Sequence, residues 1–301
     1  MKNGLVMGIL VSIFIGIIVN MDELTYFVVK TAYSLEIQDS TPNEFKKDDE
    51  FLFITHIEEL EIQKKEQVND IFYTFLNSGL EKFTFYCNTK VYPECIKDVT
   101  NLGGNGELLT DISNFVHPYN SHAKITTKTN YFGKIELSIE KNYTDTQIRK
   151  IERTVEQLID DLITASMSDV EKIKTIHDFI LKNASYDNDF LTNVSPYQSN
   201  IAYGPLFEGE AICSGYSDLM SIFLEKMGYK NYKVSSLNHV WNYVYVNNEW
   251  FHLDLTWDDP IVTNSVNYVI LHNYFLITTA ELEAKKTAEH AYNKNVFLEA
   301  K

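Results

Sequence analysis

The sequence predicts an α+β fold in which helices pack on antiparallel sheets. Two helices are indicated within 145–182, where apolar residues recur at helical spacing. Alternation of apolar and polar residues within 123–140 predicts a β-hairpin. A second hairpin is predicted within 238–256, where Asn247-Asn248 suits a tight two-residue turn. Helical and strand periods therefore occur in separate blocks along the chain.

Composition narrows the range of functions. The 301 residues suffice for one large domain or two modest ones. A hydrophobic content of 45% with 23% charged residues excludes a disordered chain and a polytopic membrane protein. The net charge of −16 leaves few cations to neutralise phosphates, so no nucleic-acid partner is expected.

The N-terminus predicts export. Residues 3–21 are almost continuously apolar and uncharged, and they follow a single lysine. This pattern is typical of a secretory signal or a membrane anchor. No small-x-small cleavage site follows, so residues 1–21 are interpreted as an uncleaved anchor, with a cleaved signal or a buried core helix as alternatives. The expected location is extracytoplasmic, membrane-anchored or secreted.

Two units are predicted after the anchor. Residues 22–50 are mixed and then charged, which is typical of a linker. Residues 51–142 are predicted to form a small α+β domain that contains no recognisable chemistry. Its expected elements, besides the first hairpin, are a strand at 51–57, a helix at 64–80, a strand at 83–86 and a short helix near 107–115.

The chain has three cysteines, an odd number: Cys87, Cys95 and Cys213. Cys87 and Cys95 flank a short loop that contains Pro93, and in an exported protein they are expected to form a local disulfide. A metal pair is not favoured, because no second pair of ligands at zinc spacing accompanies them.

Residues 143–301 are predicted to form the catalytic domain. Ser168 and Glu171 have the spacing of a capping box at the start of a helix that ends near Lys182. His177 lies within this helix among isoleucines and is interpreted as a structural histidine. Both predicted helices of this region are interpreted as scaffold.

Cys213 is predicted to lie in the first turn of a helix. The segment Gly209–Tyr216 precedes an apolar helical stripe that ends before Gly228. Free backbone N–H groups and the helix dipole at such a position favour a thiolate and can bind an oxyanion. The small residues Ser214 and Gly215 are expected to let a substrate carbonyl approach. A buried, unreactive thiol is the alternative.

The second hairpin predicts a partner for this thiol. If Val246 faces Glu249 across the turn, His239 and Asp254 project from the same face as diagonal neighbours. A carboxylate there can accept a hydrogen bond from the imidazole. A thiol, a base and an orienting acid form the set that a nucleophilic cysteine needs. A histidine facing an aspartate by chance is the alternative.

These motifs resemble the transglutaminase-like superfamily, whose members share a papain-like fold with the nucleophile helix packed on an antiparallel sheet. The resemblance spans roughly 168–276. It rests on Tyr203-Gly204-Pro205-Leu206, Gly209–Tyr216, His239-Val240-Trp241-Asn242 and the segment Trp250–Pro260. It implies that Cys213 is the nucleophile, His239 the base and Asp254 the orienting acid. Val240 departs from the alanine that members often have.

The resemblance implies acyl transfer from protein or peptide carboxamides through a thioester, and the expected partner is a protein or peptide substrate, with cell-wall peptides as one candidate class. A cysteine peptidase or amidase and a catalytically silent binding module are the alternatives. Tyr203 is a candidate for the oxyanion hole, and Trp241 and Trp257 are candidates for the substrate groove or for the core. Asp258 and Asp259 are expected to cap the turn into Pro260. No cofactor or metal is expected, since nothing resembles an oxygen-rich calcium loop.

Overall fold

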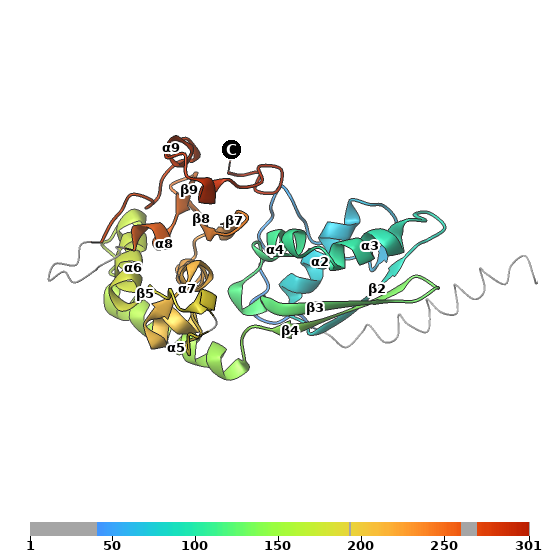
Figure 1. Cartoon of the computed structure of the whole chain (residues 1–301), viewed down its shortest axis with the longest axis horizontal. Coiled ribbons are helices and arrows are strands. Elements are labelled where there is room, and N and C mark those ends of the chain that lie inside the picture. Colours follow the sequence, from blue (N-terminus) through green and yellow to red (C-terminus); the bar gives the residue numbers. More distant parts are fainter. Residues whose placement is uncertain (1–40, 193, 260–269, 301) are drawn as a thin grey trace, which may run out of the picture.

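The computed structural model describes residues 41–192, 194–259 and 270–300. These residues form the mixed helix and sheet architecture that the sequence predicts, with an N-terminal small unit beside a larger C-terminal unit (Figure 1). The predicted anchor at 1–21 and the first part of the predicted linker lie outside the described residues. Among the residues described, no helix is long and apolar enough to cross a membrane.

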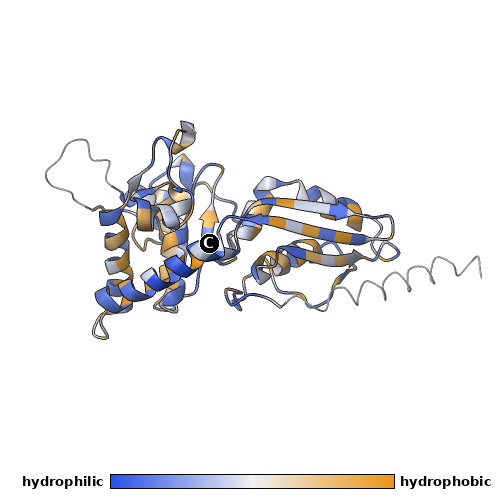
Figure 2. Cartoon of the chain, turned by 90° about the horizontal axis from the view of Figure 1, so that it is seen from below, coloured by the Kyte–Doolittle hydropathy of each residue, from blue (hydrophilic) through white to orange (hydrophobic). Residues whose placement is uncertain are grey.

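The small unit has a four-stranded sheet with helices on one face (Figure 2). The strand order is β1-β2-β4-β3. Alternate residues of β4 (Ile135, Leu137 and Ile139) are buried, as the period of the sequence predicts. The strands are β1 (Glu61–Ile62), β2 (Lys82–Cys87), β3 (His122–Thr129) and β4 (Lys134–Lys141), and the helices are α2 (Gln67–Ser78), α3 (Cys95–Gly103) and α4 (Gly106–Ser113).

One predicted element of the small unit was wrong, and one helix was missed. The segment 51–57 contains no strand, although Phe51 and Ile54 are buried in the core. Burial without a pairing partner explains the error, because apolar alternation reports burial and not hydrogen bonding. Helix α3 was not predicted, since it begins at a cysteine next to a proline-containing loop.

A disulfide joins the end of β2 to the start of α3. Cys87 and Cys95 are bonded, with Cα atoms 5.6 Å apart, in the pairing that the sequence predicts. The Cys87 N–H also donates to the carbonyl of Gly133, at 2.8 Å. Gly133 has φ of 84° and a side chain there would strike the Cys87 carbonyl. The disulfide, the β3–β4 turn and α3 therefore hold one another in place.

The larger unit is built around α7. This helix (Cys213–Lys226) is buried along most of its length between two other helices and a three-stranded sheet. The helices are α5 (Asp145–Leu162) and α6 (Asp169–Asn183), and the sheet consists of β7 (Asn231–Ser235), β8 (Val240–Val246) and β9 (Glu249–Leu253) in that order. The capping box of Ser168 and Glu171 is present. Short elements complete the larger unit: β5 (Ser185–Tyr186), η3 (Phe190–Thr192), η4 (Gly204–Glu208), β6 (Glu210–Ala211), α8 (Leu255–Asp258), α9 (Thr279–Ala284) and η5 (Ala288–His290). The small unit also contains the short helix η2 (Pro118–Asn120).

The two units share a core. Residues 41–50 do not form a free linker, because Lys47 is buried and its ammonium contacts Glu225 and the Asn231 carbonyl, each at 2.9 Å. At the other end of the chain, Phe297 is buried and stacks on Phe115 of the small unit. The predicted boundary near residue 142 therefore divides the chain along its sequence but not into independent cores.

Candidate active site

Cys213 is the first residue of α7 and the free cysteine among the described residues. Its side chain is partly exposed. The helix cap Ile212 provides no side-chain hydrogen bond, so the first turn keeps backbone N–H groups without a side-chain partner from the cap. The Ile212 N–H donates to the Ser199 carbonyl at 2.9 Å, which fixes the start of the helix against the preceding loop.

The missing side chain of Gly215 allows α7 to pack against the preceding loop. A Cβ at Gly215 would lie 2.1 Å from the Ser199 carbonyl oxygen, so the helix and the loop touch there. The Ser214 hydroxyl donates to the Asn200 carbonyl at 2.9 Å. The expectation that Ser214 and Gly215 leave room for a substrate carbonyl was therefore wrong for Gly215, whose missing side chain makes room for the protein's own backbone.

His239 and Asp254 meet as the hairpin register predicts. Val246 pairs with Glu249 and Tyr243 with His252. The His239 Nε2 and Asp254 Oδ2 atoms lie 2.6 Å apart, and both residues are buried. One detail was wrong: β9 ends at Leu253, and Asp254 instead caps α8 by accepting from the Trp257 N–H.

Hydrogen bonds between α7 and β8 bring this pair to the thiol. The Ser217 hydroxyl lies 2.8 Å from the Cys213 carbonyl and 3.0 Å from the Val240 carbonyl. The Asn242 amide donates to the Ser217 carbonyl at 2.9 Å. Strand β8 is therefore tied to the first turns of α7, and His239, which precedes this strand, is placed beside Cys213.

The pKa values of the pair are displaced in the directions that a stable ion pair requires. Burial lowers the pKa of His239, but Asp254 and Cys213 outweigh burial and raise it to about 10. Burial raises the pKa of Asp254, but His239 and His290 outweigh burial and lower it to about 2. Because Nε2 faces Asp254, Nδ1 is the ring nitrogen available to the thiol, so imidazolium is stabilised between a carboxylate and Cys213.

Two neighbours of this group have no motif in the sequence. His290, on η5, bonds Asp254 through Nε2 at 2.8 Å. Tyr186 lies near Cys213, since burial and then the charge of Cys213 raise the pKa of its hydroxyl. Tyr186 comes to the site because β5 pairs with β6, which ends just before α7. A two-residue strand and a lone histidine near the C-terminus give no periodic signal that could have predicted either contact.

The remaining predicted site residues make hydrogen-bond or packing contacts of their own. The Tyr203 hydroxyl accepts a hydrogen bond from Lys150 of α5 at 2.9 Å, so it is directed to that helix. Trp241 is only 1% exposed and donates its indole N–H to His252, which excludes it from a solvent-accessible groove. Trp257 is partly exposed and packs on His290 and Tyr274. Of the two roles expected for Trp241, the structure therefore supports packing in the core.

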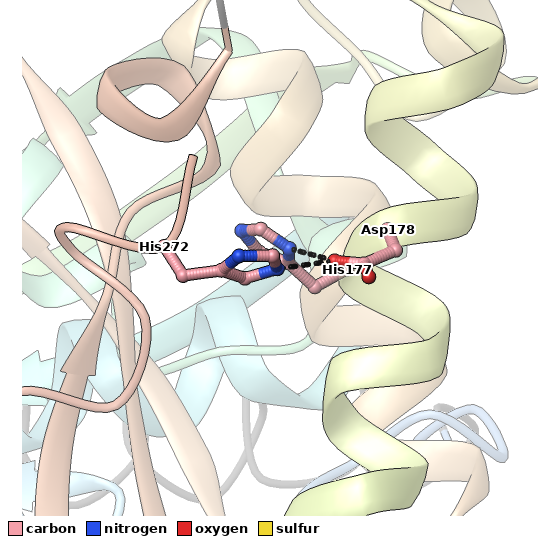
Figure 3. A group of neighbouring side chains, drawn as sticks. All are labelled: His177, Asp178 and His272. Atoms are coloured by element: carbon pink, nitrogen blue, oxygen red, sulfur yellow. Dashed lines mark hydrogen bonds and ion pairs between the residues drawn. The ribbon is translucent and has the colours of Figure 1, made fainter. Parts of the chain in front are cut away.

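His177 and Asp258 form part of a second polar cluster, which also contains Asp178 and His272. Figure 3 shows His177, Asp178 and His272 of this cluster. His177 is fully buried, with Nδ1 3.0 Å from Asp178 and Nε2 3.3 Å from Asp258. Burial lowers the pKa of His177, but the two aspartates raise it overall. His272 Nε2 lies 2.7 Å from Asp178. Asp258 thus anchors α8 to α6, a contact that the sequence does not predict, in addition to its expected place in the turn into Pro260.

In the part of the chain that the structure describes, two groups of side chains have the spacing of metal ligands: His177, Asp178 and His272, and His239, Asp254 and His290. In the first group, Lys174 Nζ lies 2.6 Å from His272 Nε2 and 2.9 Å from Asp178 Oδ2. The positive charge beside Asp178 is therefore supplied by a lysine ammonium. In the second, each histidine is engaged with the Asp254 carboxylate. Hydrogen bonding accounts for both groups.

Comparison with known proteins identifies the segment that carries this geometry. Residues 156–255 match the model of the transglutaminase-like superfamily. These residues are a transglutaminase-like domain. The matched segment contains Cys213, His239 and Asp254. The matched segment leaves out the small unit and the C-terminal segment that holds His290.

Other comparisons are more distant. A crystal structure of a TGase is 17% identical, with a TM-score of 0.36, and the likeness covers 52% of this chain and 50% of that one. A candidate cysteine protease from Cytophaga hutchinsonii is 11% identical, with a TM-score of 0.28, over 44% of this chain and 61% of that one. The chain therefore spans less than two thirds of either structure, and neither likeness carries an argument about function. No curated protein matches the chain.

Proposed function

We propose that the transglutaminase-like domain is a thiol acyltransferase that acts on protein or peptide carboxamides through Cys213, His239 and Asp254. The observation that carries the proposal is the buried His239–Asp254 pair, 2.6 Å apart, beside a free cysteine at the first residue of a helix. A thiol, a base and an orienting acid in this order are the parts of a nucleophilic cysteine site.

Each group has a defined part in the reaction. The Cys213 thiolate attacks the carboxamide carbon, and the backbone N–H groups at the start of α7 stabilise the oxyanion. His239 gives its proton to the leaving nitrogen and the C–N bond breaks. Ammonia is released, and the acyl group remains on Cys213 as a thioester. A primary amine then attacks the thioester and gives a proton to His239, the C–S bond breaks, and the thiolate is restored. Water in place of the amine gives hydrolysis.

The proposal includes an extracytoplasmic location, by an anchor or by secretion. The apolar run at 3–21 and the disulfide between Cys87 and Cys95 support it, because disulfides persist mainly in oxidising compartments. Substrates would then be exported proteins or peptides, cell-wall peptides among them.

Alkylation of the full-length chain tests the chemistry. With limiting iodoacetamide, Cys213 is expected to react well below pH 8, because the His239–Asp254 pair stabilises the thiolate. An ordinary thiol loses reactivity below its pKa of about 8.5. A Cys213→Ala variant identifies the labelled site, and His239→Ala is expected to restore ordinary behaviour. A wild-type profile like that of an ordinary thiol would refute the proposal.

A second assay separates transfer from hydrolysis. The chain is incubated with a glutamine-bearing protein and a labelled primary amine. Incorporation of the amine supports transfer, whereas peptide cleavage without incorporation indicates a cysteine peptidase or amidase. If neither occurs although Cys213 is reactive, acyl transfer from that glutamine-bearing protein is excluded.

A further inference from the structure

We infer that His290 is a positioning residue for Asp254, and that the small unit holds it in place through the C-terminal strap, defined here as residues 287–300. The inference rests on the proposed function, because it concerns the same three groups. It assigns a role to a histidine and to a unit that both lie outside the matched domain.

The geometry around Asp254 is that of a carboxylate held by two imidazoles. Its Oδ2 atom accepts from His239 Nε2 at 2.6 Å and from His290 Nε2 at 2.8 Å. Its Oδ1 atom accepts from the Trp257 N–H at 3.2 Å. Besides His239, donors on η5 and α8 therefore hold the two oxygen atoms of Asp254. The carboxylate has little freedom to rotate away from His239.

His290 is itself held in one orientation. Its Nδ1 lies 2.6 Å from the Thr287 hydroxyl, which leaves Nε2 to carry the proton toward Asp254. Its ring stacks on Tyr274, with centroids 5.0 Å apart, and meets Trp241 edge to face at 4.9 Å. The side chain is 2% exposed. Such confinement is what a positioning residue needs.

The strap continues from His290 into the small unit. Phe297 is fully buried and stacks on Phe115, with centroids 5.7 Å apart. The Glu299 carboxylate accepts from the Leu52 N–H at 2.9 Å. In Figure 1 the dark red segment runs from α9 past the β7–β9 sheet to a position beside α4. The small unit, together with Tyr232 of β7, on which Phe297 also stacks, thus anchors the far end of the segment that carries His290.

The surroundings of the pair supply several other titratable or charged groups. They are His252 on β9, Cys213 on α7, Asp258 on α8, Tyr274 and Tyr292 on the C-terminal segments, and Lys285, whose ammonium lies over the Tyr274 ring. His252 stays neutral near pH 7, because burial and then the charge of His290 lower its pKa to about 3. Substitutions at His290 and Phe297 leave all of these groups in place, so they isolate the role of the strap.

The test is the pH profile of Cys213 alkylation in the full-length chain. The acid limb is the part of the profile in which the alkylation rate falls as pH decreases. His290→Phe removes the second donor to Asp254, so this limb is expected to move up by about one pH unit. At a fixed pH below the limb, the alkylation rate is then about tenfold lower. His290→Gln, which can still donate, is expected to recover part of this loss. His272→Gln, a histidine bonded to Asp178 in the separate cluster, is the matched control and is expected to keep the wild-type profile.

The contact between the strap and the small unit is tested by a substitution at Phe297. Phe297→Ala, with folding checked by circular dichroism, is expected to move the limb in the same direction as His290→Phe. The double variant is expected to shift no further than His290→Phe alone, because both act through one contact. A wild-type profile for folded Phe297→Ala would overturn the role of the small unit.

Failure of this inference is distinguishable from failure of the proposed function. If wild-type Cys213 reacts below pH 8 and His290→Phe leaves the limb in place or lowers it, the positioning role is overturned and the proposed function stands. If wild-type Cys213 behaves as an ordinary thiol, the proposed function fails first.

Discussion

Gly215 illustrates how a single residue determines the position of the nucleophile. Its Cβ position lies 2.1 Å from the Ser199 carbonyl oxygen, so Gly215→Ala must push the loop away from α7. Overpacking of this kind costs about 1–3 kcal/mol. We expect Gly215→Ala to lower the free energy of unfolding by this amount in denaturant titrations, and to slow alkylation of the adjacent Cys213.

Gly106 provides the matched control. It is the first residue of α4, and an added Cβ there meets no atom within 4 Å. Gly106→Ala should therefore leave the free energy of unfolding unchanged or raise it by about 0.5 kcal/mol, since alanine loses less backbone entropy on folding. Equal effects of the two substitutions would show that α7 and the loop are not in tight contact.

Among the elements, β2, α3 and the β3–β4 turn depend on the disulfide. The bond closes a short loop, with a sequence separation of 8. Cross-linking over such a length lowers the conformational entropy of the unfolded chain, which stabilises the folded protein by about 2–3 kcal/mol. We expect the double substitution Cys87→Ser, Cys95→Ser to lower the free energy of unfolding by that amount. The comparison is best made in a Cys213→Ala background, so that no free thiol can exchange.

Reductant gives the control for this prediction. It should destabilise the Cys213→Ala protein by a similar amount and leave the triple variant unchanged. A triple variant as stable as its parent would mean that the sheet and α3 hold the turn without the covalent bond.

For the whole molecule, the contact between the units should respond to pH through Asp111. This residue of α4 accepts from the Ser235 hydroxyl of β7 at 3.2 Å. Burial raises its pKa to about 6, although the Ser235 hydrogen bond opposes the shift. Because the folded protein then binds this proton more tightly than the unfolded chain, Asp111 lowers stability as pH rises from about 4 to about 6.

Asp111→Asn removes that titration and retains an oxygen for Ser235. We expect the variant to exceed the wild type in free energy of unfolding by about 1 kcal/mol at pH 7, and the difference to vanish below pH 4. Exposed Glu140, replaced by glutamine, is the control and should show no such trend. A difference that does not change with pH would exclude Asp111 as the titrating group.

Much of the site follows from local rules. The Asn247-Asn248 turn sets the register of β8 and β9, and this register brings together His239 and Asp254, which lie just beyond the paired residues. The apolar stripe of α7 and its start at Cys213 are visible in the helical period. The capping box of α6 and the separation of Cys87 from Cys95 are likewise local patterns. Each depends on residues close together in the chain.

The sequence by itself determined the fold class, the register of the hairpin and the pairing of two of the three cysteines. Only the tertiary structure decided that Trp241 is buried, that Tyr203 bonds Lys150, and that His290 shares Asp254 with His239. The physical reason is distance along the chain. His290 lies 36 residues after Asp254 with no repeating pattern between them, so its contact depends on how the whole C-terminal strap packs across two units.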